Sequence, residues 1–159
     1  MWNVEGPMKY PLFILALLGI IVSSLALREH YRTYGDSPCS INERWDCGVV
    51  NHSHYAVLGA SFAVTGVFNR EIKIGIPVAA LGIAGYILMG ALAFLRSYRL
   101  LFVVILGGLG FSLYLSHIEK DILGVWCVYC VISLGIISLM TVFTLATVIV
   151  RLIRKPAAS

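Results

Sequence analysis

The stretch Ile122–Val150 reads ILGVWCVYCVISLGIISLMTVFTLATVIV and contains no charged residue. A helix needs about 20 consecutive apolar residues to cross the hydrocarbon core of a bilayer. The backbone must be helical there, because lipid offers no partner to free amide and carbonyl groups. The stretch is longer than one crossing requires, so we expect its ends to protrude or the helix to tilt. It therefore predicts a membrane-spanning helix with a Cys-Val-Tyr-Cys motif near its beginning.

Three more uncharged apolar runs precede this stretch: Tyr10–Leu27, Gly75–Leu95 and Leu100–Ser116. Of the 159 residues, 59% are hydrophobic and only 13% are charged, which leaves too little polar surface for a soluble globule. We expect an all-α integral membrane protein whose four-transmembrane-helix bundle forms a single domain over residues 1–159. The first run is also compatible with a cleaved signal peptide, with Lys9 as its basic region.

The residues between the first two spans, 28–74, form the longest segment outside the predicted membrane. Within it, Ala56–Phe68 is apolar but too short to cross a bilayer. We therefore expect an outer loop followed by a short interfacial helix that lies over the bundle.

Charges are distributed unevenly between the two ends of the predicted bundle. With four spans both termini lie on one side, which carries six basic residues against Glu5 and a net charge of +5. The other side carries a net charge of −1. The basic residues of the first side crowd next to span ends, where the positive-inside rule gives them most weight. We therefore expect cytoplasmic termini, and we attribute the overall charge of +4 to membrane orientation and not to nucleic-acid binding.

All four cysteines fall on the outer side of this predicted topology, the side on which disulfides persist. Cys39 and Cys47 lie in the outer loop, whereas Cys127 and Cys130 open the fourth span. In a CxxC motif at a helix start the two sulfurs lie about one turn apart, and the helix dipole favours a thiolate. The polar loop that carries the other pair could move between an outside partner and the CxxC motif.

Two structural alternatives fit the same cysteines. They could form two structural disulfides, although a bundle of lipid-buried helices has little need of one at its CxxC motif. A zinc site could use Cys39, Cys47, His52 and His54, but seven residues separate the two cysteines. Zinc ligand pairs are usually two to four residues apart. We therefore expect redox chemistry and no metal.

The order of these features resembles the vitamin K epoxide reductase family, which includes animal enzymes and bacterial quinone-coupled enzymes of disulfide formation. Four spans, a cysteine pair after the first and Cys127-Val128-Tyr129-Cys130 at the head of the fourth extend the resemblance over nearly the whole chain. Ser53, six residues after Cys47, fits the family pattern. Gly75-Ile76-Pro77 followed by Tyr86 is similar to the bacterial branch.

The resemblance implies a membrane thiol–disulfide oxidoreductase that supports disulfide bond formation from a bacterial inner membrane. Cys39 and Cys47 would accept electrons from a thioredoxin-like partner, and Cys47 would pass them on through a transient disulfide with Cys127. Cys130 would be the thiolate that faces a membrane quinone (menaquinone, ubiquinone or phylloquinone), and Ser53 would help to position the loop cysteine. Many bacterial relatives carry a fused thioredoxin-like domain that is not visible here, so we expect a separate partner protein.

We expect the quinone ring to meet the CxxC motif where the second span, the fourth span and the interfacial helix converge. Each candidate for lining this site could equally be a packing residue or an interfacial aromatic anchor. The candidates are Phe62, Ile76, Pro77, Ile83, Tyr86, Trp126 and Tyr129. His117, at the outer end of the third span, is either an interfacial histidine or a proton relay to reduced quinone.

Two positions depart from the animal enzymes that reduce the epoxide. Those enzymes carry an asparagine just before the second span and a tyrosine four residues after the last cysteine, where this chain has Ile74 and Leu134. The departures favour quinone reduction over epoxide reduction. The alternatives are a reductase of a vitamin K cycle and a non-enzymatic membrane protein with structural disulfides. A transporter is disfavoured, because transporters place ionisable groups within their spans.

Overall fold

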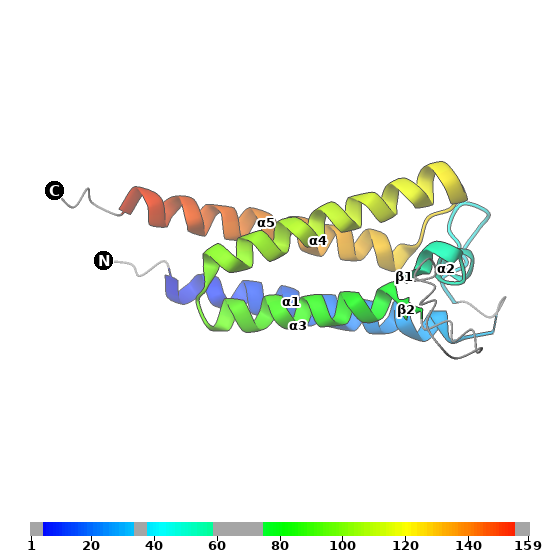
Figure 1. The fold of residues 1–159 in the computed structure, drawn as a ribbon, viewed down its shortest axis with the longest axis horizontal. Coiled ribbons are helices and arrows are strands. Elements are labelled where there is room, and N and C mark those ends of the chain that lie inside the picture. Colours follow the sequence, from blue (N-terminus) through cyan, green and yellow to red (C-terminus); the bar gives the residue numbers. More distant parts are fainter. Residues whose placement is uncertain (1–4, 34–37, 59–74, 155–159) are drawn as a thin grey trace, which may run out of the picture.

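The computed structural model describes residues 5–33, 38–58 and 75–154. Four long helices run side by side along most of its length (Figure 1). They are α1 (Glu5–His30), α3 (Val78–Phe94), α4 (Tyr98–Ile118) and α5 (Val128–Arg154). Helix α1 contacts α3 and α5, and α4 contacts the same two helices, so the four close into a bundle. The predicted all-α membrane bundle is confirmed.

Three of the long helices are both long enough and apolar enough to cross a membrane, over Lys9–His30, Tyr98–Leu123 and Val128–Ile153. Helix α3 is shorter, with 17 residues, and at 1.5 Å per residue it is about 25 Å long. The three residues before it, 75–77, are not helical, and in an extended conformation they add about 10 Å. Helix and extension together reach about 35 Å, which is more than the hydrocarbon core of about 30 Å requires.

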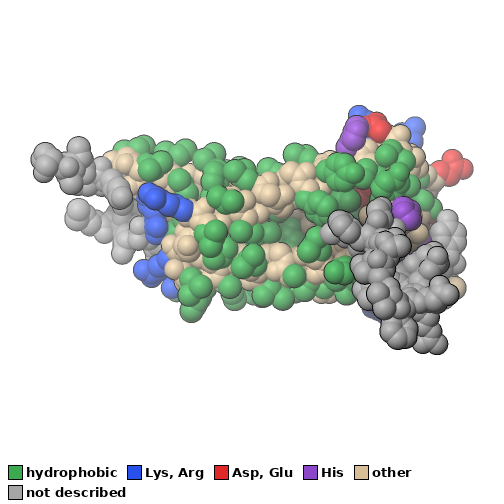
Figure 2. All heavy atoms as spheres, in the orientation of Figure 1, with side chains coloured by type: hydrophobic (Ala, Val, Ile, Leu, Met, Phe, Trp, Pro, Cys, Tyr) green, Lys and Arg blue, Asp and Glu red, His purple; other side chains and the backbone are tan. Residues whose placement is uncertain are grey.

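The buried core lies along the bundle axis, where small and large side chains of all four helices meet. Its members are Leu12, Ala16, Tyr86, Met89, Leu92, Ala93, Tyr98, Leu101, Ile105, Ile136, Ile137 and Met140. The outer face is also apolar: Phe94, Val103 and Ile153 are 71%, 64% and 77% exposed. Figure 2 shows hydrophobic side chains covering the shaft of the bundle, with lysine and arginine gathered at the end where α1 begins. Such a surface is suited to lipid and not to water.

Helix α4 does not end where the sequence predicts the turn before the fourth span. It continues as the π-helix η2 (Glu119–Leu123), and Gly124 then stops it with a left-handed φ of 68°. Helix α5 begins only at Val128, so Ile122 belongs to the preceding helix and not to the fourth span. Hydropathy does not detect this boundary, because the apolar run continues unbroken through the turn.

Short elements cover the end of the bundle where α1 ends. They are α2 (Cys47–Asn51), η1 (His54–Ala56), β1 (Val57–Leu58) and β2 (Ile76–Pro77). The two strands pair antiparallel, with Val57 opposite Pro77 and Leu58 opposite Ile76. The expected interfacial helix therefore does not begin at Ala56, because the next two residues join this sheet, and its remainder, 59–68, lies outside the described residues.

Candidate functional site

The outer loop carries a disulfide between Cys39 and Cys47, whose Cα atoms lie 5.6 Å apart. Both cysteines are buried. Cys47 is the first residue of α2, and Asp46 caps that helix. The Asp46 carboxylate accepts hydrogen bonds from the backbone N–H of Val49 at 3.1 Å and from the Ser40 hydroxyl at 2.7 Å. These bonds tie the loop and the helix together around the disulfide.

The loop is docked by its backbone against the residue that precedes the CxxC motif. The Asp46 N–H donates to the Trp126 carbonyl at 3.1 Å, and the Trp126 N–H donates to the Arg44 carbonyl at 2.8 Å. The rings of Trp45 and Trp126 face each other with centroids 6.4 Å apart. Because Asp46 and Trp126 immediately precede Cys47 and Cys127, this docking brings the two cysteine pairs together.

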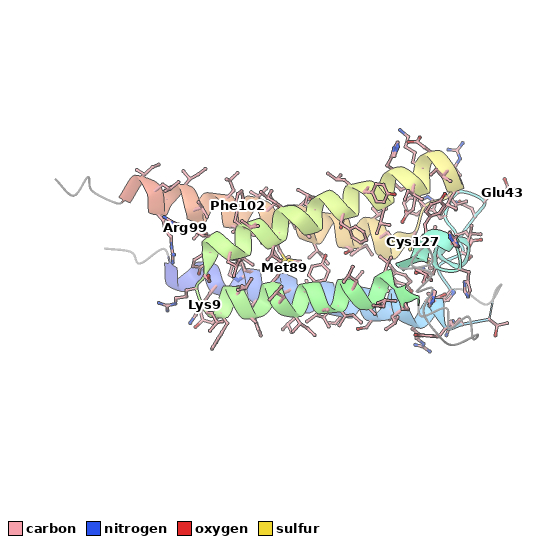
Figure 3. The ribbon with its side chains drawn as sticks, viewed as in Figure 1. Lys9, Glu43, Met89, Arg99, Phe102 and Cys127 are labelled. Carbon is pink, nitrogen blue, oxygen red and sulfur yellow. A yellow bond between two sulfur atoms is a disulfide. The ribbon has the colours of Figure 1, made fainter. Side chains whose placement is uncertain are left out.

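Three of the four cysteines share one buried cluster, to which Cys39, Cys47 and Cys127 all belong. Asn51 bridges it: its side-chain amide donates to the Cys47 carbonyl at 2.9 Å and lies 3.8 Å from the Cys127 sulfur. Figure 3 places Cys127 beside α2, at this end of the bundle. Cys130 packs against the cluster but remains partly exposed. Sequence reasoning missed Asn51, because nothing in its local pattern distinguishes it from other loop asparagines.

Cys127 and Cys130 are free thiols in this structure. The hydrogen bond with the Cys130 side chain lowers the pKa of the Cys127 thiol, and the burial of Cys127 opposes this effect without cancelling it. Backbone N–H groups at the start of α5 lower the pKa further. Because the thiolate is the reactive form in disulfide exchange, Cys127 is suited to exchange with the loop pair.

A buried acid that sequence reasoning missed lies next to the CxxC motif. Glu119 is only 2% exposed, and its carboxylate accepts a hydrogen bond from the backbone N–H of Cys127 at 3.1 Å. The carboxyl is also hydrogen-bonded to the Cys130 side chain. In the sequence, Glu119-Lys120-Asp121 has the composition of a solvated turn. Only the π-helical geometry of η2 turns the first of these residues inward.

A cavity of about 500 Å³ lies between the four long helices below α2. Its wall includes Cys130 and Glu119, together with side chains of α1, α3, α4 and α5. The wall is predominantly apolar, with polar groups concentrated at the cysteine end. Cavities of this size and character are typical of small-molecule sites.

The structure divides the predicted quinone-lining residues into two groups. Pro77, Tyr86 and Tyr129 line the cavity, and the Tyr86 hydroxyl donates to the Ser133 carbonyl at 3.0 Å. Ile76, Ile83 and Trp126 are not part of the wall of this cavity, and their contact with a quinone stays a prediction. Ile76 lies in β2, and Trp126 is paired with the loop. Phe62 lies outside the described residues.

Ser53 and the histidine before it hold the end of α2. The Ser53 hydroxyl donates to the Val50 carbonyl at 2.7 Å, and the residue lines the cavity. Any influence of Ser53 on the loop cysteine is therefore exerted through α2, which Cys47 begins. Both ring nitrogens of His52 lie 2.9 Å from backbone carbonyls, those of Gly48 and Arg32. The described residues contain no cluster of three side chains suited to a metal.

An apolar bundle in which a loop disulfide is docked against a CxxC pair is the arrangement of a membrane oxidoreductase. The chain matches the model of the Vitamin K epoxide reductase family over residues 10–145, and it belongs to that family. Members of the family are membrane oxidoreductases that use quinones and work with thioredoxin-like partners. A search of curated proteins found no match to this chain.

Proposed function

We propose that this chain is a quinone-dependent thiol–disulfide oxidoreductase that supports disulfide bond formation outside the cytoplasm. The supporting observation is the redox arrangement of its cysteines. The loop pair, Cys39 and Cys47, is oxidised and docked against Cys127, while Cys127 and Cys130 are free thiols. A pair of thiols docked beside a disulfide is the arrangement that thiol–disulfide exchange between them requires.

The relay conserves electrons at each exchange. A reduced thioredoxin-like partner gives two electrons to the Cys39–Cys47 disulfide, which opens to two thiols while the partner forms a disulfide. The Cys47 thiolate then attacks Cys127 of an oxidised CxxC pair, and the Cys130 thiolate leaves. Cys39 resolves the mixed disulfide, so the loop is oxidised again and the CxxC pair is a dithiol. The burial of Cys47 and Cys127 in one cluster supports this order of attack.

The final electron acceptor in this proposal is a membrane quinone such as menaquinone, ubiquinone or phylloquinone. The cavity is suited to a flat apolar ring, since it has a volume of about 500 Å³, is mostly apolar and reaches Cys130. Oxidation of the dithiol to a disulfide releases two electrons and two protons, which together reduce the quinone to a hydroquinone. Tyr86 and Ser133 place two hydroxyl groups, hydrogen-bonded to each other, on the same wall.

The charges at the two ends of the bundle support a membrane orientation for this proposal. Lys9 and Arg99 lie at the end away from Cys127 (Figure 3), and Arg151 stacks over Tyr98 at that end. Under the positive-inside rule this end faces the cytoplasm. The cysteines then face the periplasm of a bacterial inner membrane, where a thioredoxin-like oxidase can reach the loop.

The decisive experiment replaces Cys130 by serine and follows the reduction of a short-chain quinone by a reduced thioredoxin-like protein. The expected result is loss of quinone reduction, while the partner still reduces the loop disulfide. Ser138→Ala is a matched control, because Ser138 lies on the same helix and its hydroxyl donates to the Leu134 carbonyl within that helix. Quinone reduction by Cys130→Ser at the wild-type rate would refute the proposal.

A reductase of a vitamin K cycle is the second candidate, because the family includes epoxide reductases. Leu134, at the position of the tyrosine in the animal enzymes, packs into the apolar core. We therefore expect slow turnover of vitamin K epoxide with dithiothreitol relative to the quinone. Epoxide turnover as fast as quinone turnover would favour the second candidate.

A further inference from the structure

Glu119 is an acid in contact with both residues of the CxxC pair, and the proposed relay gives it no role. Its carboxylate accepts the Cys127 N–H at 3.1 Å, and the Cys130 side chain hydrogen-bonds to the same carboxyl. Glu119 and Cys130 also line the same cavity. One group therefore touches both members of the CxxC pair and the space proposed for the quinone.

The burial of Glu119 has no compensating cation among the described residues. Within that part of the chain, the ion pairs are Arg32–Glu29 and His117–Asp121, and neither includes Glu119. Burying a carboxylate without a cation is costly, so such groups tend to bind a proton or to serve in proton transfer.

The local backbone separates Glu119 from its charged neighbours. Lys120 and Asp121 are exposed, and Asp121 pairs with His117 on the outer surface. This pairing turns His117 toward the surface, where its side chain is 70% exposed, and away from the proton relay considered for it. Of the three charged residues of η2, only Glu119 is directed inward, and π-turns are frequent at functional sites.

Few other ionisable groups surround this carboxyl in the described part of the chain. From the start of α5 they are Cys127 and Cys130. Helix α2 also contacts η2, and its cysteine, Cys47, is bonded to Cys39. The remaining ionisable groups on the cavity wall are His30, Tyr55, Tyr86 and Tyr129. His30 is held by its ring nitrogen, 2.6 Å from the Asn51 carbonyl. Among these groups, only Glu119 is an acid that contacts both cysteines.

We propose that Glu119 is the proton acceptor for the Cys130 thiol and the donor of that proton to the quinone, an inference that rests on the proposed function. The S–H bond of Cys130 breaks, an O–H bond forms on Glu119, and Cys130 becomes a thiolate. As Cys130 bonds to Cys127, the two sulfurs lose two electrons to the quinone. Glu119 then returns to the carboxylate by giving its proton to a quinone oxygen, and the Cys127 thiol supplies the second proton of the hydroquinone.

The alternative is a purely structural role, in which Glu119 only anchors the Cys127 backbone. Glu119→Gln separates the two roles, because glutamine keeps an oxygen that can accept the N–H but cannot accept a proton. Glu119→Asp keeps a proton acceptor on a shorter side chain. Asp121→Asn is the matched control, since it removes an exposed acid two residues away in the same turn.

The first test needs no quinone. In a Cys39→Ser/Cys47→Ser background, the redox potential of the CxxC pair is measured against pH by equilibration with dithiothreitol. If the carboxyl gains or loses a proton when the dithiol is oxidised, the plot of redox potential against pH changes slope. This change of slope is the bend that the experiment looks for. The bend is expected in this background and in its Asp121→Asn control, and it should be absent in Glu119→Gln. Identical lines with and without Glu119→Gln would overturn the proposal in favour of an anchor.

The second test measures quinone reduction by the complete chain. Glu119→Gln is expected to be slower by about 100-fold, a typical contribution of general acid–base catalysis. The loss should shrink at high pH, where solvent removes the thiol proton, and Glu119→Asp should recover part of the rate. A wild-type rate and pH profile in Glu119→Gln would overturn the inference. Failure of the proposed function is a separate result, because it appears as quinone reduction by Cys130→Ser.

Discussion

At the scale of single residues, Asp46 connects the loop that carries the disulfide to the rest of the site. Its carboxylate caps α2 and accepts the Ser40 hydroxyl, while its backbone N–H donates to Trp126. Burial alone would raise the pKa of Asp46, but the hydrogen bonds from Ser40 and from the N–H groups of Val49 and Gly48 outweigh it, so the pKa is lowered. The ionised form therefore holds the loop more tightly than the protonated form.

We predict that Asp46→Ala loosens α2, with a cost of about 1 kcal/mol, as is typical of a lost N-cap. Because the folded-state pKa is lowered, the contribution of the wild-type carboxylate is present above about pH 4. It is lost as the pH falls further through the folded-state value. Amide hydrogen exchange in α2 measures the loosening. Asp46→Asn keeps an acceptor oxygen but not the charge, so it should loosen α2 less than Asp46→Ala does and should show no acid dependence; the absence of loosening in Asp46→Ala would contradict the role of the carboxylate.

The cysteines and the acid beside them show what residue patterns can and cannot predict. The four cysteines are recognisable because thiols of this spacing at one membrane face have few other uses. Glu119 and Asn51 are not, because their proximity to Cys127 depends on how η2 and α2 are turned by the packed bundle. The same limit applies to the cavity wall, where the apolar candidates differ only in the direction of their side chains.

At the scale of helices, Gly19 sets the approach of α1 to α3. A Cβ atom at this position would overlap the ring of Tyr86, whose hydroxyl bonds to Ser133 in the cavity wall. Small residues let helix backbones approach closely within a membrane. Hydropathy predicts the four apolar runs but not this contact or the helix ends, because both depend on neighbours that are distant in sequence.

We predict that Gly19→Ala lowers the free energy of unfolding by about 1–3 kcal/mol, the usual cost of overpacking. The displaced Tyr86 ring should also weaken quinone binding. Gly110→Ala is the control, because a Cβ atom there would meet nothing within 4 Å. Thermal unfolding in detergent micelles and the KM for a short-chain quinone measure the two effects. Equal behaviour of the two alanine variants would show that the contact between Gly19 and Tyr86 is unimportant.

At the scale of the whole molecule, the apolar shaft separates two chemically different ends. One end carries the arginine-rich turn between α3 and α4, and the other carries the cysteines with most of the acidic and histidine side chains (Figure 2). The division was predictable from the sequence, because span ends and charges can both be read along the chain. The shape of the cysteine end was less predictable, since its loop is held by side-chain and backbone bonds between distant residues.

The last prediction concerns which end of the bundle faces the cytoplasm. In a variant with all four cysteines replaced by serine, single cysteines are introduced as Lys120→Cys and Ser97→Cys, at exposed positions near opposite ends of the bundle. In intact spheroplasts of a bacterial host, a membrane-impermeant maleimide should label Lys120→Cys, and it should label Ser97→Cys only after permeabilisation. Labelling of Ser97→Cys alone would reverse the proposed orientation and remove the loop disulfide from the compartment of its partner. Labelling of both positions in intact spheroplasts would mean that α4 does not cross the membrane, because these residues flank that helix. A relay from a periplasmic thiol to a quinone between the helices would then have no structural basis.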